Sequence, residues 1–93
     1  MVNEEVIKTA RVLIGDFVRD RRNERGLSQT ALAEEADVDF KSIIRLEQGR
    51  GCSLSTLIRL LAVLDSYLFI EEKEGKSDLA EMMRNRWGKP ERN

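Results

Sequence analysis

The stretch Leu27–Gly49, LSQTALAEEADVDFKSIIRLEQG, has the pattern of two short helices joined by a sharp turn. A steep helix crossing needs a small residue where the helices approach and a residue that tolerates left-handed backbone at the bend. Ala33 supplies the small residue, and Asp37 stands at the turn. Ile43 and Leu46 give the second helix an inward apolar face. We therefore predict a helix-turn-helix here and interpret the rest of the chain around it.

The residues before this stretch predict one long amphipathic helix from about residue 4 to residue 24. Asn3 is placed to cap its start and Gly26 to end it. Gly15, inside it, indicates either the close approach of another helix or a kink. Its apolar residues follow the i, i+3, i+4, i+7 spacing of a helix face: Val6, Ile7, Ala10, Leu13, Ile14, Phe17 and Val18.

Three further cap residues divide the middle of the chain into helices. Ser28 and Asp39 are expected to cap the two helices of the motif, and Ser53 a following helix, LSTLIRLLAVL. This last helix has more apolar residues than one core face requires, which predicts a contact with a second subunit. The residues concerned are Leu54, Leu57, Ile58, Leu61 and Leu64.

The chain changes character after Asp65. Residues 66–73, SYLFIEEK, are rich in aromatic and β-branched residues and predict a strand. A lone strand leaves its backbone groups unpaired, so we expect it to pair with the same strand of a second copy as a two-stranded ribbon. The alternative is an extended tail packed on its own domain. The side chains assigned to this dimer or partner contact are Tyr67, Phe69, Ile70 and, further on, Trp87.

A last short helix is expected before the C-terminus. Asp78 and Glu81 have the spacing of a capping box, and Leu79, Met82, Met83 and Trp87 then form an apolar stripe. Trp87 is either an anchor in the core or dimer, or a docking residue for another protein. We accordingly divide the chain into a helix-turn-helix domain, residues 1–65, and a dimerisation or partner-binding extension, residues 66–93.

Composition limits the possible functions. The 93 residues suit a single domain, and the net charge of −1 argues against a strongly basic one. There is no histidine and only one cysteine, Cys52, so we expect no enzyme, no cofactor, no metal and no small-molecule substrate. A lone cysteine and the absence of a long apolar run favour a cytoplasmic protein without membrane contact. Cys52 is interpreted as a small loop residue.

The helix-turn-helix pattern and its flanking helices, roughly Arg11 to Asp65, resemble the Cro/phage-repressor (Xre) family. The resemblance implies a mainly α, repressor-like bundle of four to five helices, with the short C-terminal strand and last helix added. It also implies a homodimer that binds double-stranded DNA and places the motif's second helix in the major groove. The residues that fall at the family's DNA-contacting positions, aligned by LSQ and by E-x-G, are Gln29, Phe40, Lys41, Ser42, Arg45, Gln48 and Arg50.

The resemblance implies a role for each of these positions. Gln48 and Arg50 would contact the DNA backbone, and Ser42 would lie at the edge of the base-reading set. Gln29 would anchor a phosphate, Lys41 and Arg45 would suit guanine, and Phe40 would press on a thymine methyl or else be tucked into the core. Two other residues, Arg22 and Glu47, match an ion pair that braces the fold in similar proteins. We predict a structural role for them.

Helix order and strand position further resemble the antitoxin of Hip-type toxin–antitoxin pairs, which implies a toxin protein as an additional partner. The leading interpretation is a repressor or autoregulator acting on a palindromic operator. The alternative is a protein–protein interaction module that keeps the helix-turn-helix without strong DNA binding, an alternative favoured by the near-neutral charge.

Overall fold

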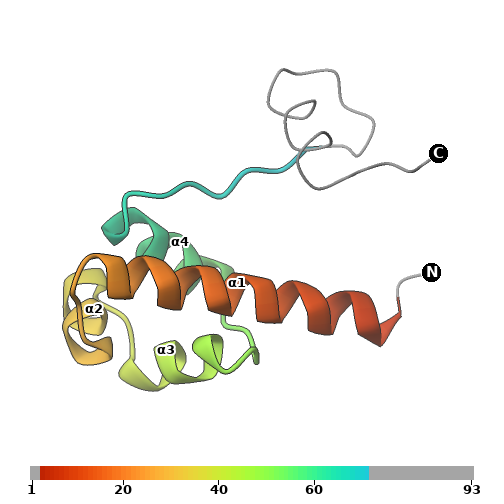
Figure 1. Cartoon of the computed structure of the whole chain (residues 1–93), viewed down its shortest axis with the longest axis horizontal. Helices are drawn as coiled ribbons and strands as arrows, with labels where there is room; N and C mark the ends of the chain where they lie inside the picture. The colour runs from red at the N-terminus through yellow and green to blue at the C-terminus, as the bar shows by residue number, and fades with distance from the viewer. Residues whose placement is uncertain (1–2, 72–93) are drawn as a thin grey trace.

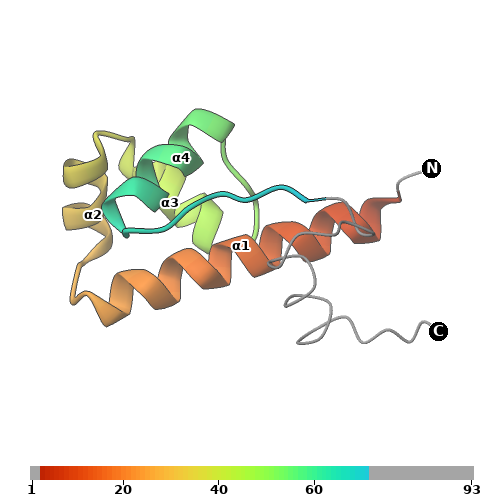
Figure 2. The ribbon, with the colours of Figure 1, turned by 90° about the horizontal axis from the view of Figure 1, so that it is seen from above.

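The computed structural model describes residues 3–71, and within this range all the regular secondary structure is α-helical (Figure 1). The helices are α1 (Glu4–Glu24), α2 (Gln29–Ala36), α3 (Phe40–Glu47) and α4 (Leu54–Val63). The long α1 packs against α3, and α2 packs against both α3 and α4. Figure 2 shows the three shorter helices gathered at the C-terminal half of α1, so that its N-terminal half projects beyond them.

The predicted helix starts are formed by side-chain caps at three of the four helices. The side chains of Asn3, Ser28 and Ser53 accept hydrogen bonds from backbone amides at the starts of α1, α2 and α4. The prediction for Asp39 was wrong in part. Asp39 occupies the N-cap position of α3, but its side chain makes no cap hydrogen bond. The amide of Ser42 donates instead to the main-chain carbonyl of Asp39, at 3.0 Å.

The four described helices end in the same way, at a residue with positive φ: Gly26, Asp37, Gly49 and Asp65. At the end of α3, the amide of Gly49 donates to the carbonyl of Leu46, and the amide of Arg50 to that of Arg45. This pair of bonds is a Schellman motif, which satisfies carbonyls that the helix leaves without partners. The chain therefore reverses sharply after each helix, and the bend predicted at Asp37 is confirmed with φ 56°.

The core lies where α2, α3 and α4 meet the C-terminal half of α1. It is aliphatic, as the low aromatic content requires, and its fully buried side chains are Val18, Leu32, Ile43, Leu46, Leu60 and Leu64. Gly15 lies against α3, because a Cβ added there would collide with the main-chain oxygen of Leu46. The close-approach interpretation of Gly15 is thus confirmed, and α1 continues unbroken through it.

The C-terminal prediction differs from the structure. No strand is assigned within residues 3–71, and residues 66–71 run as extended chain from the end of α4 (Figure 1). The physical reason is that residues 3–71 of a single chain offer no neighbouring strand to pair with. Residues 72–73 of the expected strand, the last helix and Trp87 lie outside the described residues. Within the described range, no helix is both long and apolar enough to cross a membrane.

The surplus of apolar residues on α4 divides between its two faces. Leu57, Leu61 and Leu64 are buried in the core. Leu54 and Ile58 are 62% and 50% exposed. The contact with a second subunit that this surplus was taken to indicate stays a prediction.

Candidate nucleic-acid interface

One side of α3 is polar and exposed to solvent. Its buried apolar residues, Ile43 and Leu46, turn toward the core, while Lys41, Arg45 and Gln48 are exposed. These three follow each other at i, i+4 and i+7, so they lie along one side of the helix. The same periodicity that buries the apolar side of α3 therefore lines up its polar side chains.

The turn after α3 adds a fourth polar side chain to this face. The Schellman bond from the amide of Arg50 to the carbonyl of Arg45, 2.9 Å, fixes the backbone there. The guanidinium of Arg50 donates to the side-chain oxygen of Gln48 at 3.4 Å. The shallow hollow that results has a volume of about 340 Å³ and is lined by Lys41, Ile44, Arg45, Gln48 and Arg50. Four of the seven predicted DNA-contacting residues are thus brought together.

Phe40 and Ser42 lie at the N-terminal end of the same helix. Phe40 is the first residue of α3 and its side chain is 41% exposed, so it does not belong to the buried core. The structure thus excludes the tucked-in alternative. Ser42 is half-buried. The carboxylate of Asp39, without a cap hydrogen bond, stands exposed at the same helix end and adds a negative charge there.

Glu47 is the central buried group behind this face. Its carboxylate accepts hydrogen bonds from Arg22 Nε at 2.7 Å and Arg22 Nη2 at 2.9 Å, and from Gln29 Nε2 at 3.0 Å. The side chains of Arg22 and Glu47 are only 12% and 5% exposed. Arg22 Nη1 also donates to the carbonyl of Leu27, at 2.9 Å. The family resemblance implied that Arg22 pairs with Glu47, and the structure has them in a two-pronged ion pair.

This contact ties three helices together. Arg22 comes from α1, Gln29 begins α2, and Glu47 ends α3. The hydrogen bonds that Arg22 donates to Glu47 raise the pKa of the Arg22 guanidinium. Burial lowers this pKa in part, and the negative charge of Glu47 raises it further. Arg22 therefore stays charged, and the ion pair fixes the orientation of α3 relative to α1 and α2.

Gln29 has a contact that the sequence analysis missed. We expected its side chain to face a phosphate, but its amide nitrogen donates to Glu47. An amide nitrogen carries two hydrogens, so one such bond and a phosphate contact are compatible. A buried acid was not expected beside it, because the sequence does not show that residues 29 and 47 meet.

Two arginines of α1 also reach this region without having been predicted. Arg19 Nη1 donates to the carbonyl of Glu47 at 3.3 Å and so caps the end of α3, while its Nη2 pairs with Asp16 at 2.6 Å. Arg11 lies against the turn after α3, since a Cβ added to Gly51 would come within 3.0 Å of Arg11 Nε. Their only sequence signal is the i, i+4, i+8 spacing of Arg11, Gly15 and Arg19, which places them on one side of α1.

The hollow on α3 suits a polyanion better than a metal. Among residues 3–71, no group of three or more His, Cys, Asp or Glu side chains could hold a metal ion. Lys and Arg side chains with an adjacent amide are instead the groups that contact phosphates and base edges. Four helices with such an exposed third helix define a helix-turn-helix domain.

Comparison with known families agrees with this class. A family model described as helix-turn-helix matches residues 18–69, which is more than half of the chain. The chain belongs to this Xre/Cro-type helix-turn-helix family, a family of DNA-binding proteins. A search of curated proteins gives no match.

Proposed function

We propose that this protein is a sequence-specific transcriptional regulator, which binds a palindromic operator as a homodimer and represses or autoregulates its own operon. The observation that carries the proposal is the exposed face of α3. There Lys41, Arg45, Gln48 and Arg50 line one hollow. The buried ion pair between Arg22 and Glu47 holds α3 in place, so the orientation of these side chains relative to the other helices is restricted. Preorganised side chains of this kind are what base readout in the major groove requires.

We assign these residues either to base edges or to the DNA backbone. Lys41 and Arg45 are suited to guanine O6 and N7, and Phe40 to a thymine methyl. Gln48 and Arg50, at the end of α3, are placed for the DNA backbone, as is Gln29 at the start of α2. Ser42 stands at the edge of the reading set. The negative charge of Asp39 weakens phosphate attraction at this end and favours a cytosine N4 amino group nearby.

A homodimer would supply the second recognition helix. Two helices about one DNA turn apart, ~34 Å, fit half-sites of a palindrome. The support for a dimer is the apolar chain after α4, where Tyr67, Phe69 and Ile70 are 95%, 51% and 85% exposed. Soluble monomers seldom leave such adjacent apolar side chains in water. The two-stranded ribbon across the two-fold axis remains our proposal for how they are covered.

The direct test is binding to duplex DNA, measured by fluorescence anisotropy. A randomised duplex pool is first selected for a cognate site, and binding is then measured from low to high salt. The logarithm of the affinity should fall linearly with the logarithm of salt concentration if phosphates are engaged. Arg45→Ala should weaken the cognate site by about 1–3 kcal/mol. The matched control is Arg59→Ala, because Arg59 is an exposed arginine of α4 paired only loosely with Asp37 at 3.6 Å.

A protein–protein interaction module is the second candidate. The net charge of −1 and the exposed Asp39 favour it, since both reduce attraction to DNA. The same titration separates the two functions. If no duplex binds at low salt while the protein remains folded, the DNA proposal fails and the interaction module is left. Equal loss in Arg45→Ala and Arg59→Ala would also contradict the assigned face.

A narrower form of the regulator proposal is the antitoxin of a toxin–antitoxin pair. Its support is the helix order followed by the exposed apolar residues after α4. It would give the chain a second partner, a kinase-like toxin. Co-expression with the product of the adjacent gene tests it: an antitoxin should co-purify with that product and relieve its toxicity. A neighbouring gene of another kind, or no complex, would remove this form and leave the regulator intact.

A further inference from the structure

An exposed apolar stripe runs along α1 from its projecting N-terminal half into the half that packs on the other helices. Val6, Ala10, Leu13 and Phe17 follow the spacing i, i+4, i+7 and i+11, so they lie along one side of the helix. Val6, Leu13 and Phe17 are 59%, 64% and 45% exposed, and Ala10 is exposed as well. At 1.5 Å per residue the stripe is ~16 Å long. We call these four residues the α1 stripe.

The chain leaving α4 is directed toward this stripe. In Figures 1 and 2, residues 66–71 run beside α1 in the direction of its N-terminal end. Leu68 and Phe69 share a hollow of about 310 Å³ with Leu13 and Phe17 of the stripe. The part of the chain that follows residue 71 therefore starts from beside α1.

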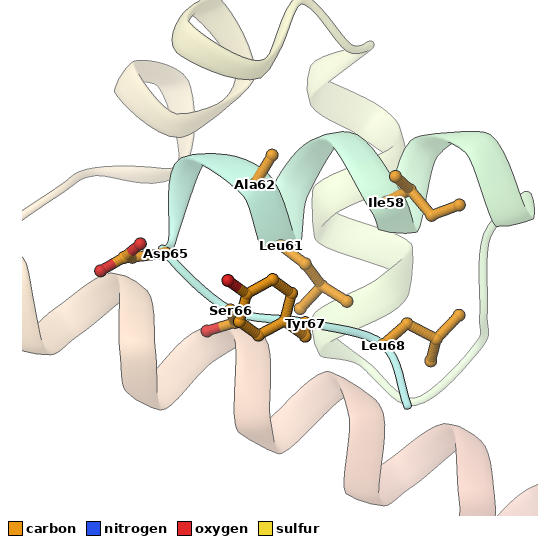
Figure 3. Close-up of a pocket in the computed structure, with 7 residues that line it drawn as sticks. All are labelled: Ile58, Leu61, Ala62, Asp65, Ser66, Tyr67 and Leu68. Carbon is orange, nitrogen blue, oxygen red and sulfur yellow. The ribbon is translucent and has the colours of Figure 1, made fainter. Parts of the chain in front are cut away.

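A second hollow lies on the other side of the same residues. It has a volume of about 450 Å³, and Figure 3 shows Leu61 of α4 pointing toward Tyr67, with Ile58 and Leu68 nearby. Tyr67 and Leu68 thus line two apolar hollows, one bounded by α1 together with α4 and one bounded by α4 alone. Only the hollow toward α1 continues into a longer apolar surface, since the stripe extends from Phe17 back to Val6.

The sequence beyond residue 71 contains a segment that matches the stripe. Leu79, Met82, Met83 and Trp87 have helical spacing, and together they would extend ~12 Å along a helix. Asp78 and Glu81 would start that helix as a capping box. The six residues between, 72–77, can span up to ~20 Å when extended, which is enough to bring the segment onto α1.

We propose that residues 78–87 form an amphipathic helix that packs on the α1 stripe of the same chain. The occupant is taken from the same chain because a short tether gives it an effective concentration in the millimolar range, which favours it over a free second copy. Methionines adapt to irregular apolar surfaces, and Trp87 supplies the largest area to bury. The C-terminal segment then acts as a cover for the projecting half of α1.

The single tryptophan of the chain provides the test, independently of any DNA binding. In the folded 93-residue chain, Trp87 fluorescence should have a shorter-wavelength maximum and weaker acrylamide quenching than in the urea-unfolded chain. Leu13→Glu and Val6→Glu should each move both values toward those of the unfolded chain. The matched control is Leu54→Glu, because Leu54 is 62% exposed on α4, away from the stripe. Unchanged circular dichroism should show that all three variants remain folded.

Three results would overturn the proposal. The first is solvent-like emission from Trp87 in the unmodified protein. The second is a larger shift for Leu54→Glu than for the stripe variants, which would place the segment on α4. The third comes from mixing Leu13→Glu with a Trp87→Phe chain, which keeps an intact stripe but has no tryptophan. If mixing restores the short-wavelength emission, the segment docks on a second copy; for the same-chain arrangement the emission stays unchanged.

Discussion

Glu47 shows how a single buried residue can set the geometry of the polar face of α3 without belonging to it. Its carboxylate accepts three hydrogen bonds, two from Arg22 and one from Gln29. Burying a carboxylate without such partners would be very costly, whereas a paired and hydrogen-bonded one is tolerated. The side chain therefore favours the one arrangement of α1, α2 and α3 in which all three bonds form.

Removing Arg22 should be strongly destabilising for this reason. Arg22→Ala leaves the charge of Glu47 buried without its main partner, and we expect a loss of about 3–5 kcal/mol in the free energy of unfolding. Urea unfolding followed by circular dichroism measures it. Arg21→Ala is the matched control, because Arg21 pairs with Glu24 on the exposed side of the same helix and should cost only about 0–1 kcal/mol. Similar losses in the two variants would show that Arg22 has no special structural role.

Cys52 gives a pH-dependent prediction. Burial raises the pKa of its thiol, and the positive charge of Arg45 only partly offsets this. Because the thiolate is the reactive form, alkylation by iodoacetamide should have its midpoint at a higher pH in the folded protein than in urea. The thiol favours the folded state fully below the unfolded pKa, and this contribution is lost as pH rises through the folded pKa. An equal midpoint in both states would contradict the burial of Cys52.

At the scale of elements, the approach of α1 to α3 is set by Gly15. A Cβ at this position would collide with the main-chain oxygen of Leu46, and backbone cannot move aside as the end of a flexible side chain can. Arg19 then reaches the carbonyl of Glu47, one turn further along α1. Both contacts depend on the same short distance between the two helices.

Gly15→Ala should therefore destabilise the protein although alanine is the better helix former. The gain in helix propensity is about 1 kcal/mol, and we expect the forced separation of α1 and α3 to exceed it, for a net loss of about 1–3 kcal/mol. Thermal unfolding measures the change. Thr9→Ala, on the exposed part of α1, is the control and should be neutral or slightly stabilising. A more stable Gly15→Ala protein would mean that the helices can separate without cost.

At the scale of the whole molecule, a single chain leaves a large apolar surface exposed outside the core. It lies on the α1 stripe, on the outer side of α4 and on the residues after α4, where Tyr67 and Ile70 are the most exposed. We propose that two contacts bury this surface. The dimer would bury the residues after α4, and the docking of residues 78–87 would bury the α1 stripe.

The dimer proposal predicts a change in mass on altering the exposed side chains. Light scattering at micromolar concentration should give twice the mass of the 93-residue chain. Tyr67→Lys with Ile70→Lys should give a monomer that remains helical, because both side chains lie outside the core. The matched control is Glu34→Lys with Glu35→Lys, which places two lysines at exposed positions of α2 outside the proposed contact. A monomeric unmodified protein would contradict the ribbon.

Local sequence signals were sufficient for most of the helical fold. The spacing of apolar residues predicted α1 as residues 4–24, and Ser28, Asp37, Gly49 and Ser53 were placed correctly at helix boundaries because capping and left-handed turns depend on the residues themselves. The selection of Lys41 and Arg45 came from the family resemblance, and both line the hollow on α3. Asp39 was the exception among the caps, since its backbone takes the cap position without its side chain.

The remaining features needed residues far apart in the chain to meet. Three contacts follow from the packing of the helices on one another. Gln29 donates a hydrogen bond to Glu47, Arg19 caps α3, and Arg11 lies against the turn at Gly51. The sequence by itself determined where each helix begins and ends and which side of it is apolar, because these depend on neighbours within a turn or two. Only the tertiary structure decided which polar groups are buried together and which apolar ones remain in water, because burial depends on the whole arrangement of the helices.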